Sequence, residues 1–220
     1  MSNWLTQIYA PGVERKNYID DFRDYLLDGN KTSSGVHVSP DNAMQITAVY
    51  ACVKVISESL AQLPFSVMRR DGSDRFRDDN HALYDLFGYK PNSWQTPFEY
   101  IENAIAHCLL RGNHIAIKVK SSDGRILELL PVNPDMVMAE QLRNYEVIYK
   151  IGNEKIGYRT FKQDEIFHLR GMGGNGFWGQ SAITLHREAM GLAKATERHG
   201  STLFGNGARP GGILKHPSRS

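Results

Sequence analysis

The stretch from Pro91 to Pro134 constrains the fold of this 220-residue chain most, because it begins with a complete helix start signal. The Thr96 hydroxyl can accept a backbone hydrogen bond, and Pro97 suits the first helical position because its missing N–H would have no partner there. Glu99 completes a Thr-x-x-Glu capping box, and Gly112 can adopt the left-handed conformation that ends a helix. We therefore predict a helix that begins at Pro97 and ends just before Gly112.

The residues after this helix indicate what it packs against. Its apolar residues recur at spacings of three and four and form one stripe: Phe98, Ile101, Ile105 and Cys108. From Ile115 to Val119 apolar side chains alternate with Ala and Lys, residues 122–124 (Ser-Asp-Gly) form a turn, and Ile126 to Leu130 is a second apolar run. The stretch predicts a helix lying against a β-hairpin.

The residues before Pro91 predict two further helices and a strand. A helical period ends at Pro64 and predicts a first core helix with this apolar stripe: Ile46, Val49, Val53, Ile56 and Leu60. Phe65 and Val67 begin a strand that turns at Asp71-Gly72, and residues 74–80 form a charged surface link. His81 to Phe87 then forms a short helix closed by Gly88.

The residues after Pro134 are mostly of β type, followed by a long helix. The strand pattern places four apolar residues on one face: Tyr145, Val147, Tyr149 and Ile151. Gly152-Asn153 turns the chain, and further strands cover Tyr158–Phe161 and Ile166–Leu169. Ser181 caps a helix that reaches about Phe204, with this apolar side: Ala182, Leu185, Ala189 and Leu192. We expect one more strand at Ile213-Leu214.

These elements predict an α+β fold in which helices pack on antiparallel hairpins or a mixed sheet. We divide the chain into three parts: an N-terminal arm over residues 1–43, partly disordered, an α+β domain over residues 44–215, and a short tail over residues 216–220.

Charge and hydropathy narrow the classes of function. The net charge of +2 is too small for a chain that binds nucleic acid over its whole surface. Contact with DNA would therefore require a local stripe of basic residues. No apolar run reaches the length of a membrane span, and residues 1–30 lack the pattern of a signal peptide. We therefore expect no membrane partner and expect the protein to be located in the cytoplasm. Cys52 and Cys108 lie in apolar helical patterns, which favours buried, reduced thiols.

Two enzymatic readings find weak support. The glycines of Gly171–Gly176 fit G-x-G-x-x-G after a predicted strand, but Phe177-Trp178-Gly179 separates them from the next helix and no acidic residue follows Glu197. A cysteine nucleophile served by His168 or His114 would need an accessible thiol, and the histidines show no metal spacing. We therefore expect no catalytic residue, no cofactor and no metal.

One basic stripe stands out on the last predicted helix. Arg187, Lys194 and Arg198 lie seven and four residues apart and therefore share one face. Such a stripe could follow DNA phosphates without sequence preference, could pair with acidic residues of a neighbouring subunit, or could simply be a solvated face. DNA contact through these three residues is our hypothesis for nucleic-acid binding.

An ordered set of short motifs resembles the portal proteins of long-tailed bacteriophages with HK-fold capsids. The motifs cover roughly Ile46 to Leu214 and occur in the same order as in that family. They are Val49 to Pro64, Pro91-Asn92, Thr96 with Phe98-Glu99, Gly112-Asn113, Leu130-Pro131 with Pro134, Asp164 to Arg170, Gly179-Gln180-Ser181, and Phe204 to Pro210.

This resemblance implies a structural protein that forms a dodecameric ring at one capsid vertex of the virion, after assembly in the bacterial host cytoplasm. Its partners would be further copies of itself, the terminase large subunit, the major capsid or scaffold protein, head-completion proteins, and double-stranded DNA that passes through without sequence preference. The chain resembles the wing-like body of a portal and stops before the stem helices, the clip and the channel loop. Alternatives are a protein-interaction domain unrelated to phage and a nucleotide-binding enzyme that uses the Gly171–Gly176 loop.

Overall fold

The computed structural model describes residues 32–153 and 157–207, and the chain divides into two compact units. One unit is Ser39–Met190, and the other combines Met1–Val38 with Gly191–Ser220, of which residues 32–38 and 191–207 are described. Most of the predicted arm, the predicted strand at Ile213-Leu214 and the predicted tail therefore lie outside the described residues, and our three-part division stays a prediction. Among the described residues, no helix is both long enough and apolar enough to cross a membrane.

Helix α5 (Pro97–Arg111) is the central helix of the larger unit, and it begins and ends where the sequence predicts. Both hydrogen bonds of the Thr96–Glu99 capping box form, and Gly112 adopts a left-handed φ of 78°. The buried face is only partly the predicted stripe: Tyr100, Ile101, Ala104 and Leu110 are buried, whereas Phe98 is exposed and Cys108 half-buried.

The predicted hairpin is present as β3 (Asn113–Lys120) and β4 (Ile126–Val132), which pair antiparallel. Strand β8 (Ile166–Arg170) pairs with the other edge of β3, so the sheet order is β4-β3-β8. Successive side chains of β3 serve different cores, as the alternation predicts. Ala116 packs in the core that includes residues of α5, and Ile115 packs in the core that includes residues of the second sheet.

The second sheet has the order β5-β6-β7, and all its pairs are antiparallel. Its strands are β5 (Val137–Gln141), β6 (Val147–Asn153) and β7 (Gly157–Lys162), with the 3₁₀ turns η2 (Pro134–Met136) and η3 (Gln163–Glu165) before β5 and β8. The sequence patterns did not single out β5. Tyr145, predicted on a strand face, lies in the turn before β6 with a positive φ of 67° and is exposed.

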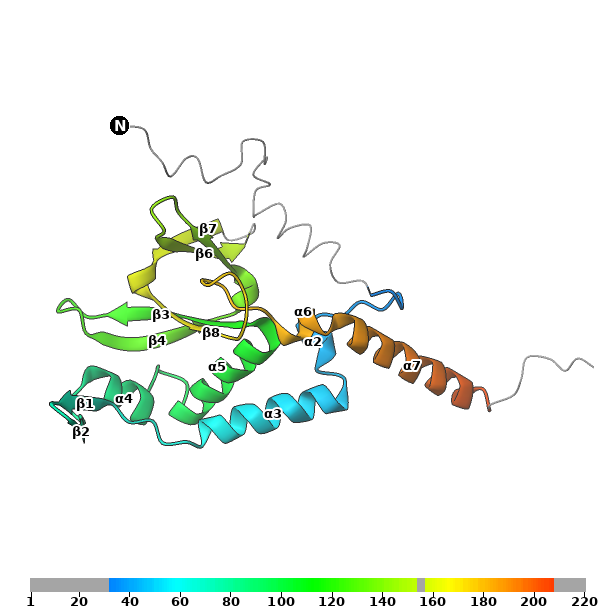
Figure 1. Cartoon of the computed structure of the whole chain (residues 1–220), viewed down its shortest axis with the longest axis horizontal. Helices are drawn as coiled ribbons and strands as arrows, with labels where there is room; N and C mark the ends of the chain where they lie inside the picture. The colour runs from blue at the N-terminus through cyan, green and yellow to red at the C-terminus, as the bar shows by residue number, and fades with distance from the viewer. Residues whose placement is uncertain (1–31, 154–156, 208–220) are drawn as a thin grey trace, which may run out of the picture. The chain divides into compact units, whose positions relative to one another are not determined.

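Helix α3 (Thr47–Ala61) packs on α5, and the short α2 (Pro40–Ala43) precedes it. Figure 1 shows α5 between α3 and the β4-β3-β8 sheet. The helix forms where predicted, but the predicted stripe is buried only in part. Val53, Ser57 and Ala61 are buried, whereas Ile56 and Leu60 are exposed. Small side chains at Ser57 and Ala61 let α3 approach α5 closely, and the Ser57 hydroxyl donates to the Val53 carbonyl at 2.8 Å.

The segment between α3 and α5 contains a two-stranded hairpin and a short helix. The strand expected at Phe65 begins at β1 (Met68–Asp71), and part of the expected surface link is its antiparallel partner β2 (Asp74–Arg77). Helix α4 (Ala82–Gly88) forms at the predicted place, capped by the His81 side chain.

The helix predicted from Ser181 is two helices. Ser181 caps α6 (Ala182–Leu185), His186 leaves the helical conformation with φ −105° and ψ 18°, and α7 (Arg187–Gly205) follows. The predicted apolar side is wrong as a core face, because Leu185 and Leu192 are exposed.

Candidate functional site

Backbone segments approach one another closely where α5 ends and β3 begins. Gly112 has a left-handed φ of 78°, and a Cβ at this position would lie 2.4 Å from the backbone carbon of Gln180. The Gly171 N–H donates to the Gly112 carbonyl at 2.8 Å. The backbone therefore approaches so closely here that only glycine fits at position 112.

Asn113 follows directly and is completely buried. Its amide nitrogen donates to the Gly179 carbonyl at 2.8 Å, and its Oδ1 accepts from the Gly179 N–H at 2.7 Å. The same Oδ1 lies 3.0 Å from Nε2 of His168. Because Oδ1 can only accept, His168 Nε2 must carry the proton and donate it.

The His168 ring connects the two sheets. Its Nδ1 lies 3.0 Å from the hydroxyl of Tyr149 on β6, and with the proton on Nε2 this Nδ1 accepts from that hydroxyl. Burial lowers the pKa of His168 to about 4, with a smaller contribution from the positive charge of Arg170. The ring is therefore neutral near pH 7, as this set of hydrogen bonds requires. We call Gly112, Asn113, Tyr149, His168 and Gly179 the Asn113 junction.

A second histidine pair lies between α5 and β3. His114 is fully buried, with Nε2 3.2 Å from the Tyr100 hydroxyl and Nδ1 3.4 Å from Nδ1 of His107. Burial lowers the pKa of His114 to about 3 and that of His107 to about 4. Both rings are therefore neutral near pH 7, and no group of three or more metal-ligating side chains occurs in the described part of the chain.

The structure does not support a nucleotide site in the glycine-rich loop. Gly173, Gly174 and Gly176 have positive φ values, and a Cβ on Gly174 would collide with the Trp178 carbonyl oxygen. Arg170 donates to the Gly176 carbonyl. These glycines allow the loop backbone to turn back closely on itself. The helix after the loop, α6, is only four residues long, which is too short to hold a pyrophosphate at its N-terminus as a dinucleotide-binding helix does.

The cysteine prediction is half right. Both thiols are free, but Cys52 is exposed rather than buried. Cys108 is half-buried, its thiol lies 3.5 Å from the Leu169 carbonyl, and burial raises its pKa to about 11. The Cys108 thiol is therefore protonated near pH 7 and unsuited to attack a carbonyl.

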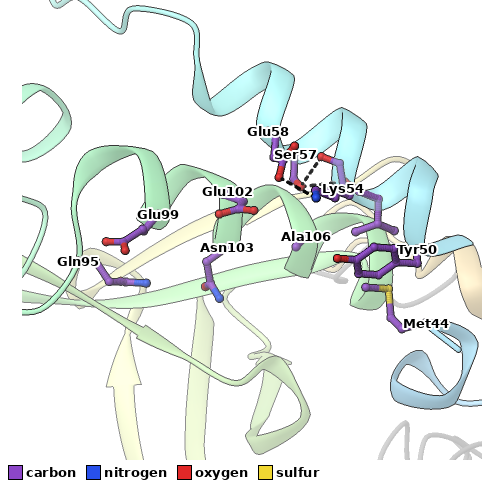
Figure 2. Close-up of a pocket in the computed structure, with 11 residues that line it drawn as sticks. Met44, Tyr50, Lys54, Ser57, Glu58, Gln95, Glu99, Glu102, Asn103 and Ala106 are labelled. Atoms are coloured by element: carbon purple, nitrogen blue, oxygen red, sulfur yellow. Dashed lines mark hydrogen bonds and ion pairs between the residues drawn. The ribbon is translucent and has the colours of Figure 1, made fainter.

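A groove of about 450 Å³ runs between α3 and α5 (Figure 2). Its charged lining consists of Glu58 and Lys54 from α3 and of Glu99 and Glu102 from α5. Asn103 also lines it, and Asn103 Oδ1 is shielded from solvent without a hydrogen-bond donor among the described residues. Sequence patterns did not single out this groove, because its residues come from two helices about 40 positions apart.

The three predicted DNA-contacting residues all lie on α7. Lys194 and Arg198 are one helical turn apart, and Arg187 lies at the start of the helix. Arg198 is exposed, whereas Arg187 and Lys194 are half-buried and have interactions within the chain. Contact of these three residues with DNA stays a prediction.

Both the family model and a curated relative that match this chain are described as phage portal proteins. The family model described as "Phage portal protein" matches residues 47–220. The portal protein of Enterobacteria phage HK97 is 32% identical over 179 residues, which cover 80% of this chain and 42% of that protein.

Solved structures share the fold. A chain from the neck of an empty GTA particle, computed with C6 symmetry, matches with a TM-score of 0.61 and 24% identity over 76% of this chain and 44% of that chain. A chain from the neck of the native GTA particle, computed with C12 symmetry, matches with a TM-score of 0.56 and 20% identity over 79% of this chain and 48% of that chain. The chain therefore spans less than half the length of each of these three proteins.

Proposed function

Because the chain belongs to the phage portal protein family, a family of structural rather than enzymatic proteins, we propose that it is a structural subunit of a portal ring at the capsid vertex. The observation that supports this proposal most is the family match from residue 47 to residue 220, which spans all helices and strands from α3 onward. The antiparallel α+β fold shared with chains from particle necks agrees with it.

The mechanism of such a subunit is geometric. A cyclic assembly needs two different, mutually complementary faces on each copy, so that the contacts close into a ring around an axial hole. The wall of that hole must let a polyanion pass without retaining it, and a chain with a net charge of only +2 suits this requirement.

In this proposal double-stranded DNA enters and leaves the capsid through the ring. The terminase large subunit, the major capsid or scaffold protein and head-completion proteins of the tail connector bind to the assembled ring. The protein would then reside at the portal vertex of the virion or of a gene-transfer particle, after assembly in the bacterial host cytoplasm.

The native mass of the chain tests the assembly step. Light scattering on a sizing column, over a range of concentrations, should reveal a species of roughly 300 kDa if twelve 24.8 kDa copies close into a ring. Negative-stain images should then show closed rings with an axial hole. A mass of one copy at every concentration would contradict ring formation by these 220 residues.

A further inference from the structure

The groove between α3 and α5 has the chemistry of a site for a cationic side chain. Three glutamates, Glu58, Glu99 and Glu102, line it against one lysine, Lys54, which gives the lining a formal net charge of −2. Lys54 lies 3.8 Å from Glu58, so the charges of Glu99 and Glu102 on α5 are not balanced by it directly. Figure 2 shows Glu58 and Lys54 reaching from α3 toward the α5 side of the groove.

Two uncharged groups in the groove fit the same chemistry. Asn103 Oδ1 is a shielded acceptor without a donor among the described residues, and a buried acceptor of this kind is costly unless something donates to it. The ring of Tyr50, about half exposed, lines the same groove and offers a face on which a guanidinium can stack. An arginine side chain presents five N–H groups in a planar fork and can satisfy the acceptor and a carboxylate together.

The same chain carries a complementary basic surface. Lys194 and Arg198 on α7 are four residues apart, about 6 Å along the helix axis. The Glu99 carboxylate already accepts from the Thr96 backbone N–H and hydroxyl, so Glu102 and Asn103 are the acceptors of the groove that remain for a cation. Arg198 is exposed and is the leading candidate for entry into the groove.

We propose that the α3–α5 groove of one copy binds the basic stripe of α7 from a second copy, with Arg198 directed to Glu102 and Asn103. The proposal rests on the proposed ring function, because a ring needs two unlike faces that fit each other, and this acidic groove and basic stripe are such a pair. The opposite charges orient the two copies head to tail and disfavour groove-to-groove or stripe-to-stripe contacts.

A charge-reversal experiment tests this contact between copies. The single variants Glu102→Arg and Arg198→Glu should each weaken self-association about tenfold or more, measured by light scattering and sedimentation, because each places like charges opposite each other. An equal mixture of the two variants should assemble nearly as well as the wild-type chain. In the mixture, the arginine introduced by Glu102→Arg can meet the glutamate introduced by Arg198→Glu, and the unchanged Glu102 and Arg198 can meet at the next contact, so opposite charges face each other at every contact.

Control variants change the same charges elsewhere. Glu146→Arg and Arg143→Glu lie in the exposed turn between β5 and β6 and should leave the mass distribution unchanged. Circular dichroism should show that all four variants are folded. If a reversal does not fold, the milder Glu102→Gln and Arg198→Gln take its place in the single-variant measurement, and each should weaken self-association by removing one charge of the pair.

Each other outcome overturns the proposal in a distinguishable way. If the wild-type chain forms rings and both single variants do as well, the contact is wrong but the ring function stands. A chain that carries both Glu102→Arg and Arg198→Glu is a further test. If this double variant assembles and the mixture of single variants does not, the two surfaces meet within one copy. If Arg198→Glu lowers affinity for a short DNA duplex without a change in mass, the stripe is a DNA surface. If the wild-type chain never assembles, the ring function and this contact both fail for these residues.

Discussion

The Asn113 junction and the outer face of α3 belong to the same compact unit but differ in whether their side chains have partners within the chain. In the junction, polar groups from β3, β6, β8 and the 171–180 loop satisfy one another away from most of the solvent, and Gly112 admits no side chain. On the outer face of α3, Cys52, Val55, Ile56 and Leu60 carry no charge and are exposed.

This difference separates intrinsic stability from assembly. A fully satisfied polar cluster fixes its own geometry and needs nothing from outside, because an unpaired buried group would be costly. An exposed, uncharged helix face contributes little to the folded monomer and is typical of surfaces that contact other molecules. Substitutions in the junction should therefore affect folding, whereas those on the outer face of α3 should hardly affect it.

The largest expected effect is that of Gly112→Ala. The new Cβ would meet the Gln180 backbone at 2.4 Å in a conformation with φ of 78° that Ala rarely adopts, so we expect a loss of about 3 kcal/mol or more in the free energy of unfolding. Urea unfolding followed by circular dichroism measures it. The matched control is Gly124→Ala, where φ is 84° but no atom lies within 4 Å, and the loss should be about 1 kcal/mol. Equal losses in both variants would show that the close approach at Gly112 does not matter.

Acid should lower the free energy of unfolding through three histidines whose pKa values are lowered by burial. The pKa of His168 in the folded chain is about 4, below the 6.5 of an unfolded chain, so the unfolded state binds protons first as the pH falls. The stability from the neutral ring is fully present above pH 6.5 and is lost between pH 6.5 and 4. His107 and His114 act in the same direction, because burial also lowers their pKa values.

Urea midpoints at several pH values measure this loss. We expect a decrease of about 1–3 kcal/mol in the free energy of unfolding from pH 6.5 to pH 4. His168→Gln keeps a donor for Asn113 and an acceptor for Tyr149 but cannot titrate, so its stability should fall less steeply with pH. A variant curve parallel to that of the wild type would show that His168 is not held neutral.

The contrast also explains which features could be predicted from sequence. The bounds of α5 and the β3–β4 hairpin depend on local signals such as Thr96, Glu99 and Gly112, and these were predicted correctly. The buried face of α3 was predicted correctly only at Val53, because nearly every position of that helix is apolar or small and several faces fit the helical period. Its true face is chosen by α5, which is distant in sequence.

The candidate sites depend on contacts that a linear pattern does not contain. Asn113 meets Gly179 across 66 positions, and His168 meets Asn113 across 55. Nothing in the sequence connected Gly112-Asn113 with Gly179-Gln180-Ser181, which stood as separate motifs of the resemblance, and the structure joins them at one junction. The groove between α3 and α5 was missed because Glu102 and Asn103 look like ordinary polar residues of a helix.

The smallest expected effect is that of Ile56→Ser on the outer face of α3. Ile56 is 43% exposed, and Ser has a similar helix propensity, so the free energy of unfolding of the monomer should change by about 0.5 kcal/mol or less. The matched variant Val53→Ser, less than one turn away, removes a buried side chain at 8% exposure and should cost about 2 kcal/mol. Urea unfolding at low protein concentration measures both without a contribution from assembly. If Ile56→Ser costs as much as Val53→Ser, the outer face is covered in the folded monomer and the contrast with the Asn113 junction fails. If its cost grows with protein concentration, a second copy covers the face, because stability that depends on association follows mass action.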